Sequence, residues 1–333
     1  MDMQRYSRQT LFKSLSKNDQ KKLYKSKIAI IGVGATGTVT AELLARAGLG
    51  TITLADRDYI EKSNLQRQTL FDENDIGKAK AEIAKEKLEK INSDIKIQSI
   101  ICDINASNIQ KIVDGKDLII DCTDNMETRF LINDCSKKHD IPWIYTAAIG
   151  SKGATMSLVP EDNPCFRCVF KDMPKGVLET CETSGILNSA STAIASFAAA
   201  EAIKILTKKK HSKTLTYIDV WHQRIDRIDI KKRSDCPSCR GEYEFLEKKI
   251  ETRTISLCGK NAYQIVPAKE KKLDLVKMFP KFRNAGTASI FGPVLHFRKD
   301  GIDMSIFNDG RAIIKNAKSE SDAKSLYSRY VGN

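Results

Sequence analysis

One stretch of the sequence, residues 28–80, constrains the fold more than any other. It opens with an apolar run at residues 28–31 and continues into a Gly-x-Gly-x-x-Gly turn. The glycines are Gly32, Gly34 and Gly37. A helical pattern and a second apolar run follow, and the run ends at Asp56, 19 positions after Gly37. A strand, a glycine turn, a helix, a strand and an acid at this spacing predict a nucleotide site whose acid meets a ribose hydroxyl.

The rest of the first 150 residues alternates between helical and strand patterns. Helical periodicity at residues 76–91 and 129–138 alternates with strand patterns at 95–101, 118–120 and 142–149. This order predicts a doubly wound, mostly parallel, Rossmann-like α/β sheet. In such sheets ligands bind at the carboxyl ends of the strands. We therefore expect the glycine turn, Asp56 and residues 121–125 to face a single crevice.

Composition changes near residue 243 and divides the chain. Residues 242–251 are charged and linker-like, and short strand and helix patterns follow them. One such pattern is a single strand at 254–265, and another is a final helix at 322–331. We predict one domain at 1–243 and a small α+β domain at 244–333, near the lower size limit for a domain that folds alone.

Charge and hydropathy limit the classes of function. The formal net charge is +13, with lysine and arginine runs at 208–210 and 231–233. Aromatic residues do not interleave with these runs, which favours solvated loops over a nucleic-acid site, although an acidic protein partner also fits. Residues 1–27 lack the apolar core of a signal peptide, and the Ala-rich segment 185–206 predicts a buried helix rather than a membrane span. We expect a cytoplasmic protein.

Four of the nine cysteines form two Cys-x-x-Cys pairs. They are Cys165, Cys168, Cys236 and Cys239. Four thiolates can close a tetrahedral zinc site, in which no coordination position is left open for catalysis. The alternative, a redox-active pair, needs only one Cys-x-x-Cys. An odd number of cysteines in a reducing compartment also argues against a disulfide framework.

Cys181 stands apart from the pairs, in a polar loop that leads into the Ala-rich helix. A cysteine at a helix N-terminus has a lowered pKa and is a candidate nucleophile; the alternative is a cysteine with no function. The remaining cysteines lie in strand or helix patterns and are expected to be buried as apolar side chains. They are Cys102, Cys122, Cys135 and Cys258.

Four charged residues matter only through their context, because an isolated surface Arg, Lys or Asp is normally just solvated. They are Arg8, Arg67, Lys80 and Asp124. Arg67 and Lys80 follow the strand that ends at Asp56, where side chains can reach a triphosphate. Asp124 lies where a Mg²⁺ ligand is wanted.

Several strings occur together in a distinctive order. They are Arg5-Tyr6-Ser7-Arg8-Gln9, the glycine turn, Asp56-Arg57-Asp58, Ser63-Asn64-Leu65-Gln66-Arg67-Gln68, Gly77-Lys78-Ala79-Lys80, Asp121-Cys122-Thr123-Asp124-Asn125, the four paired cysteines and Thr180-Cys181. Over residues 4–240 the chain thus resembles the MoeB/ThiF family, relatives of the ubiquitin-activating enzymes. The two polar strings that begin at Ser63 and Asp121 are far more specific than the glycine turn. Two departures are Ala35 in the glycine turn and Asn188-Ser189 after Cys181, where relatives carry Gly-Pro.

The resemblance implies that ATP adenylates the C-terminal glycine carboxylate of a small ubiquitin-like protein ending in Gly-Gly. It implies an ATP site made from Gly32, Gly34, Gly37, Asp56, Asp58, Asn64, Arg67, Lys80, Asp124 and Asn125. Asp56 would hold the ribose; Asn64, Arg67 and Lys80 would hold the phosphates; Asp124 would hold Mg²⁺. The family forms homodimers, so Arg8 would reach the neighbouring subunit's triphosphate. Cys181 matches the position that accepts the acyl group in some members.

Three alternatives remain open from the sequence. A tRNA threonylcarbamoyladenosine dehydratase type of enzyme also adenylates a carboxylate, and the positive charge favours it, whereas the Cys-x-x-Cys pairs favour carrier activation. An NAD-dependent oxidoreductase would use the glycines but leave Arg67, Lys80 and Asp124 unexplained. A non-catalytic partner subunit would not need these phosphate-contacting residues.

Overall fold

The computed structural model describes residues 2–160, 162, 164–172, 184–247, 253–257, 262–267 and 272–332, with only the backbone described for 253–257. Two compact units make up the chain. The large unit comprises Met1–Ile76, Lys80–Pro174 and Gly185–Lys248, and most of the small unit is Lys249–Asn333. The domain boundary at residue 243 stays a prediction.

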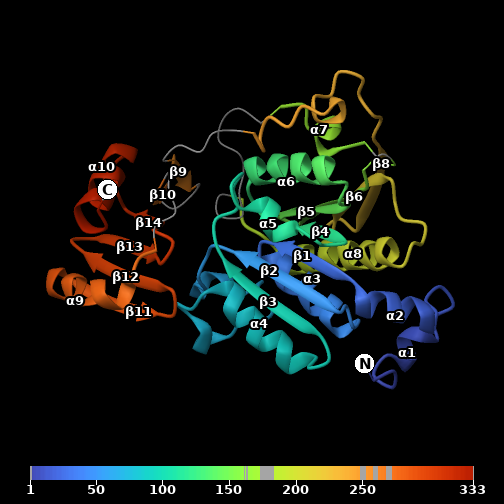
Figure 1. Cartoon of the computed structure of the whole chain (residues 1–333), viewed down its shortest axis with the longest axis horizontal. Coiled ribbons are helices and arrows are strands. Elements are labelled where there is room, and N and C mark those ends of the chain that lie inside the picture. Colours follow the sequence, from blue (N-terminus) through green and yellow to red (C-terminus); the bar gives the residue numbers. More distant parts are fainter. Residues whose placement is uncertain are drawn as a thin grey trace. The chain divides into compact units, whose positions relative to one another are not determined.

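The large unit is built on an eight-stranded sheet in the order β3-β2-β1-β4-β5-β6-β7-β8 (Figure 1). The first five strands in this order are parallel. They are β3 (Lys96–Ile101), β2 (Thr51–Asp56), β1 (Lys27–Ile31), β4 (Leu118–Asp121) and β5 (Trp143–Ile149). Three antiparallel strands extend the sheet: β6 (Lys152–Leu158), β7 (Thr214–Asp219) and β8 (Arg224–Asp229). The predicted α/β class with a mostly parallel sheet is confirmed.

Helices cover both faces of this sheet because the strands are apolar on both sides. Alternate residues of β1 enter two different cores: Ile28 and Ile30 face one, Ala29 and Ile31 the other. The first core contains α3 (Ala35–Arg46), α4 (Lys80–Ile91) and α8 (Asn188–Leu206), and the second contains α5 (Ile109–Val113) and α6 (Met126–His139). The helix predicted over 76–91 begins only at Lys80.

The remaining helices of the large unit are short. They are α1 (Ser7–Thr10), α2 (Lys17–Lys25), η1 (Lys62–Asn64), η2 (Glu73–Asp75), α7 (Phe166–Val169) and η3 (Ser238–Arg240). Among the described residues, α8 alone is long and apolar enough to span a membrane by length and composition. Half of its apolar window is buried, and α8 packs on α3, β5 and β6 as a core helix does.

The small unit has a six-stranded antiparallel sheet in the order β11-β12-β13-β14-β10-β9. Its elements are β9 (Arg253–Leu257), β10 (Ala262–Val266), α9 (Leu275–Ala285), β11 (Thr287–Phe291), β12 (Val294–Lys299), β13 (Ile302–Phe307), β14 (Ala312–Lys315) and α10 (Glu320–Tyr330). Both helices pack on one core with the sheet, which confirms the small α+β class. The single strand expected at 254–265 is wrong: β9 and β10 pair antiparallel, so the chain reverses between them.

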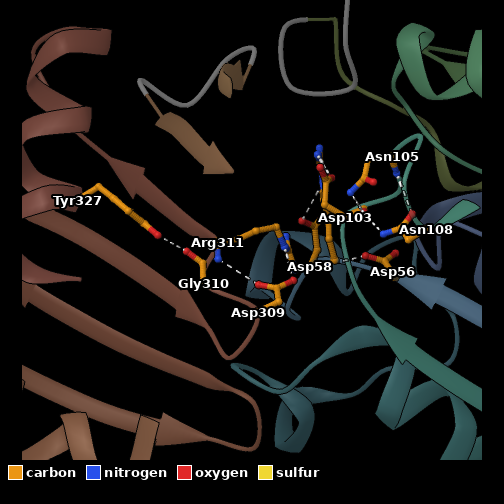
Figure 2. Close-up of polar contacts among 10 residues, drawn as sticks. Asp56, Asp58, Asp103, Asn105, Asn108, Asp309, Gly310, Arg311 and Tyr327 are labelled. Atoms are coloured by element: carbon orange, nitrogen blue, oxygen red, sulfur yellow. Dashed lines mark hydrogen bonds and ion pairs between the residues drawn. The ribbon is translucent and has the colours of Figure 1, made fainter. Parts of the chain in front are cut away.

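A fixed turn joins β13 to β14 in the small unit (Figure 2). The carbonyl of Gly310 accepts a 2.5 Å hydrogen bond from the Tyr327 hydroxyl on α10. The Arg311 Nε atom lies 2.7 Å from Oδ2 of Asp309. Gly310 has a φ of +87°, which a glycine adopts readily. Residues 308–310 therefore form a tight turn.

Candidate functional site

The glycine turn joins β1 to α3, and two of its glycines are required by space. A Cβ atom on Gly32, whose φ is +89°, would lie 2.6 Å from the Cys122 carbonyl oxygen. A Cβ on Gly37 would lie 2.1 Å from the Gly32 carbonyl oxygen. Both clashes are with backbone and cannot be relieved by a side-chain movement. These glycines bring the turn close to the end of β4.

Gly34 serves a different purpose, because it is the N-cap residue of α3. Its φ is −91°, and a Cβ there would be 3.9 Å from Nε2 of Gln68, an ordinary contact. The N-cap carries no side-chain hydrogen bond, and the first turn of α3 contains no acidic residue. The N–H groups and positive dipole end of α3 are therefore left for an anion.

Asp56 ends β2 and lies against the glycine turn. Its Oδ2 accepts a 2.5 Å hydrogen bond from the Val33 N–H, and its Oδ1 accepts a 2.7 Å bond from the Asp58 N–H. Burial raises the pKa of Asp56, and the nearby Lys80 charge opposes that rise. The carboxylate is thus fixed at the carboxyl edge of the sheet, with each oxygen still able to accept a second bond.

Lys80, the first residue of α4, is the central cation of the site. Its side chain is only 8% exposed, and its Nζ atom lies 3.3 Å from Oδ2 of Asp58. Burial alone would lower the pKa of Lys80, but the charges of Asp58, Asp56 and Asp124 together raise it. Three carboxylates from two segments, the ends of β2 and β4, are therefore close enough to hold one buried ammonium group charged.

A second cation, Arg57, lies beside this group at the ends of β2 and β3. Its Nη1 atom lies 2.8 Å from Oδ1 of Asp103. Figure 2 shows Asp103 with Asn105 and Asn108, whose side-chain amides donate to the Asp103 carbonyl at 3.1 and 2.7 Å. Burial opposes the charge of Arg57, yet Asp103, Asp58 and Asp124 raise its pKa. The sequence motif contained Arg57, but nothing in it indicated Asp103 as the partner.

A buried ion pair between Asp121 and Arg129 anchors the loop after β4. Asp121 is fully buried and accepts from the Arg129 Nε at 3.1 Å and from the Thr123 hydroxyl at 2.6 Å. Burial raises the pKa of Asp121, and Arg129 counteracts it. Asp124 is exposed on this loop, and Asn125 caps α6 by accepting from the Thr128 N–H at 3.1 Å. Sequence reasoning missed Arg129, whose helical position gave no signal of its role.

The polar string after β2 divides into inward and outward side chains. Asn64 is buried in η1, and its Oδ1 accepts from the Glu61 N–H at 3.1 Å. Arg67 is half-buried, and its Nη1 donates to the Ser63 carbonyl at 2.8 Å. Gln68 is buried at 3% exposure. Asn64 and Arg67 are thus anchored to their own loop.

Arg8 is not brought to this group within one chain. Its helix α1 adjoins the far end of α3, where Gln9 donates to the Ala47 carbonyl at 3.0 Å. Ala47 follows the last residue of α3, whereas the glycine turn precedes the first. Arg8 itself is exposed. The candidate nucleophile Cys181 lies outside the described residues, as does Cys258.

The four paired cysteines converge in the large unit. Their sulfur atoms all lie within 4.8 Å of one another. The shortest separations are 3.4 Å for Cys165 and Cys236, 3.5 Å for Cys165 and Cys239, and 3.6 Å for Cys168 and Cys239. Sulfur atoms bound tetrahedrally at about 2.3 Å from one zinc ion lie about 3.8 Å apart, so these thiols have the spacing of a four-Cys metal site.

Helix α6 ties both arms of this cluster together. The Phe166 N–H, next to Cys165, donates to Oδ1 of Asn133 at 2.8 Å. On the other arm, the Ser238 hydroxyl donates to Oδ1 of Asp134 at 2.6 Å, and the Phe245 N–H donates to Oδ2 at 2.9 Å. Asp134 is fully buried, and burial raises its pKa. Two adjacent side chains of one helix thus fix segments about 70 residues apart.

Residues 6–238 match the ThiF family of proteins.

The chain belongs to the ThiF family.

The similarity to one relative extends over the whole chain. The sulfur carrier protein ThiS adenylyltransferase of Bacillus subtilis is 39% identical, over 98% of this chain and 99% of the relative. The Escherichia coli protein of the same name is 34% identical over 72% of this chain and 96% of its own length. The SAMP-activating enzyme E1 of Haloferax volcanii is 31% identical over 77% of this chain and 96% of its own length.

The fold of the large unit is also found in solved structures. The crystal structure of E. coli MccB with ATP superposes with a TM-score of 0.62 and 27% identity. It covers 71% of this chain, and the match spans 74% of MccB. The Bacillus subtilis, Escherichia coli and Haloferax volcanii relatives are named as adenylyltransferases or an activating enzyme, which confirms the enzyme class predicted from the sequence.

Proposed function

We propose that this protein uses ATP to adenylate the C-terminal glycine carboxylate of a small ubiquitin-like sulfur carrier. The observation that carries the proposal is Lys80, a buried cation with three acidic neighbours, Asp56, Asp58 and Asp124, near the N-terminus of α3, which has no side-chain cap. The names of the relatives, two ThiS adenylyltransferases and a SAMP-activating enzyme, support the carrier as substrate.

The nucleotide would lie across the carboxyl ends of β1, β2 and β4. Asp56 would bind the ribose hydroxyls with its unused acceptor capacity, and the N-terminus of α3 would bind phosphate. Lys80, Arg67 and Asn64 would contact the triphosphate, with Asp58 and Asn125 lining the same site. Arg67 would first have to leave its 2.8 Å contact with Ser63, which is on an exposed surface and easily exchanged.

The reaction needs alignment more than acid–base chemistry. An oxygen of the glycine carboxylate attacks the α-phosphorus, the bond from that phosphorus to the bridging oxygen breaks, and pyrophosphate leaves. The carboxylate is already ionised at neutral pH, so no residue has to remove a proton. What the protein supplies is positive charge near the developing charge, from Lys80, Arg67 and the α3 dipole.

Two metal ions fit the residues present. Asp124 offers an exposed carboxylate beside the site, the hard oxygen ligand that Mg²⁺ prefers, and Mg²⁺ would neutralise phosphate charge. The four cysteines have the donor set and spacing of a structural zinc site. Such a site would fix the segments around Cys165 and Cys236 without taking part in the chemistry.

The site would be completed in a homodimer. Arg8 is exposed and lies at the opposite end of α3 from the glycine turn, so it would serve a neighbouring subunit's triphosphate. Cys181 would accept the carrier's acyl group after adenylation. A zinc site of four cysteine thiolates requires reduced cysteines, which fits a reducing, cytoplasmic location.

Carrier-dependent exchange between ATP and labelled pyrophosphate tests the proposal. We expect exchange with a carrier that ends in Gly-Gly, and none with the same carrier lacking these two residues. The chain's charge of +13 keeps a tRNA-bound carboxylate as the second candidate substrate. Exchange that requires tRNA instead of the carrier would contradict our proposal. Tight NADH binding without ATP binding would contradict both.

A further inference from the structure

Gln68 is a buried polar side chain that the proposed roles leave unused. The residue is 3% exposed. Its Oε1 atom is sealed from solvent and has no hydrogen-bond partner among the described residues. A buried acceptor without a partner destabilises a folded protein, so its presence calls for an explanation.

The backbone of Gln68 is hydrogen-bonded on both sides, which fixes the direction in which its side chain leaves the chain, and the side chain is buried. Its N–H donates to the Asn64 carbonyl at 3.0 Å, and its carbonyl accepts from the Phe71 N–H at 3.1 Å. The neighbouring Arg67 is directed toward the surface, where it contacts the Ser63 carbonyl. Gln68 is therefore the inward-facing residue at this point of the loop.

The amide of Gln68 faces the start of α3. Its Nε2 atom would lie 3.9 Å from a Cβ at Gly34, the N-cap of that helix. Because Gly34 has no side chain, nothing from that residue shields the amide from the space in front of the helix. The helix has twelve residues, no side-chain cap and no acid in its first turn. An anion bound to the α3 N–H groups would thus have the Gln68 amide beside it.

We propose that Gln68 is a nucleotide-binding residue whose Nε2 donates a hydrogen bond to a phosphoryl oxygen held at the N-terminus of α3. This inference rests on the proposed function, because it takes ATP as the ligand. A neutral donor suits the position: it stabilises phosphate without adding another charge to the buried group around Lys80. The unpartnered Oε1 then reflects a side chain kept for binding at the expense of stability.

The decisive variant is Gln68→Met, which keeps the length of the side chain and removes both hydrogen-bonding atoms. We expect the affinity for a non-hydrolysable ATP analogue, measured by calorimetry, to fall about tenfold, the loss of roughly one hydrogen bond. The melting temperature of the nucleotide-free protein should stay equal or rise, because the unpartnered acceptor is gone. Gln66→Met is the matched control: Gln66 is exposed, contacts the Ile186 carbonyl at 3.5 Å, and should keep wild-type affinity.

The Gln68→Glu variant tests whether the side chain donates a hydrogen bond to the nucleotide or accepts one. A carboxylate can only accept, so it would repel phosphate, and we expect it to weaken analogue binding more than Met does. If the Gln68→Glu variant binds the ATP analogue as tightly as the wild-type protein does, Gln68 is not a hydrogen-bond donor to the nucleotide. If Gln68→Met lowers the melting temperature and leaves affinity unchanged, the residue is structural and the inference fails.

The same measurements separate this inference from the proposed adenylation. Analogue binding requires no carrier. Wild-type protein that binds the analogue but shows no carrier-dependent exchange would refute the adenylation and leave Gln68 to be judged by its affinities. Wild-type protein that does not bind the analogue would overturn both.

Discussion

Lys80 and Asp58 are joined twice, through their side chains and through their backbones. The Lys80 Nζ lies 3.3 Å from Oδ2 of Asp58, and the Lys80 N–H donates to the Asp58 carbonyl at 3.0 Å. The backbone bond fixes the start of α4 to the segment that follows β2. The side chain at the first position of α4 is thereby directed at the acidic ends of the strands. Position 80 is thus defined by backbone geometry before any ligand arrives.

Lys80→Met should remove most of the proposed activity. We expect carrier-dependent pyrophosphate exchange to fall by about 100-fold, the effect of losing one charge-stabilising group in an enzyme site. Lys80→Arg should restore only part of the rate, because a planar guanidinium does not occupy the position of a compact ammonium. Lys85→Met, on the same helix, is the control and should behave as wild type. Near-normal exchange by Lys80→Met would contradict the assigned role.

The raised pKa of Lys80 predicts how the stability that its ion pairs contribute depends on pH. The pKa of Lys80 is raised by its acidic neighbours although burial opposes this. A cation with a raised folded pKa contributes stability that is complete below its unfolded pKa, about 10.4, and lost as the pH rises through the folded value. Denaturant unfolding of wild type and Lys80→Met should therefore differ by a constant amount from pH 7 to 9. The difference should shrink only above about pH 10. A difference that disappears near pH 8 would show that Lys80 is not paired as described.

Metal analysis tests the four-Cys cluster directly. We expect about one zinc ion per chain, because four thiolates close one tetrahedral site. Cys168→Ser should lose the metal and unfold at a lower temperature. Cys135→Ser, which changes a buried cysteine outside the cluster, should retain the metal even if it is destabilised. Zinc-free wild-type protein of unchanged melting temperature would refute a structural zinc site.

Asp134 should support that cluster from a distance. Asp134→Ala would leave the Ser238 hydroxyl and the Phe245 N–H without their acceptors. Each buried group without a partner costs about 1–3 kcal/mol, so we expect the loss of two partners to lower the free energy of unfolding by about 2–6 kcal/mol. Zinc should also leave faster in the presence of a chelator. The exposed Asp114→Ala is the control for both measurements. Equal zinc release by the two variants would show that Asp134 does not hold the second cysteine arm.

The sequence predicted elements whose signals are local and missed those set by distant partners. The glycine turn, Asp56 and the Cys-x-x-Cys pairs are local patterns, and the structure has the predicted sheet and cysteine cluster. The pairing of Arg57 with Asp103 joins the ends of two strands 46 positions apart, which no local pattern encodes.

Two missed strands and one side chain illustrate the same limit. In the β8 sequence, Arg-Ile-Asp-Arg-Ile-Asp, apolar and polar residues do not alternate with a period of two. The reason is that β8 is an edge strand with no buried face, so neither side of it has to be apolar. Strand β6 follows a turn and pairs antiparallel with β5, beyond the alternating strands and helices from which a mostly parallel sheet was predicted. The burial of Gln68 near Gly34 is a tertiary arrangement of residues 34 positions apart, so its sequence position could not reveal it.

Subunit mixing tests whether Arg8 completes a neighbouring site. Arg8→Ala and Arg67→Ala should each abolish exchange as pure proteins. In a hybrid dimer, one subunit has Arg8→Ala with a normal Arg67, and the other has Arg67→Ala with a normal Arg8. Each site combines Arg67 of one subunit with Arg8 of the other. One of the two sites in every hybrid then has both changes and the other has none. Random mixing makes about half of the dimers hybrids, so about a quarter of the wild-type activity should return.

The control for subunit mixing is a pair of variants that affect one subunit's own residues. Arg67→Ala mixed with Lys80→Met should restore no exchange, because every site in that hybrid lacks one of the two groups. Recovery in this control would mean that Arg67 and Lys80 come from different subunits. Failure of Arg8→Ala and Arg67→Ala to complement, with hybrids demonstrated by mass, would show that Arg8 acts within its own chain or not at all. The exposed position of Arg8, at the opposite end of α3 from the glycine turn, leads us to expect complementation.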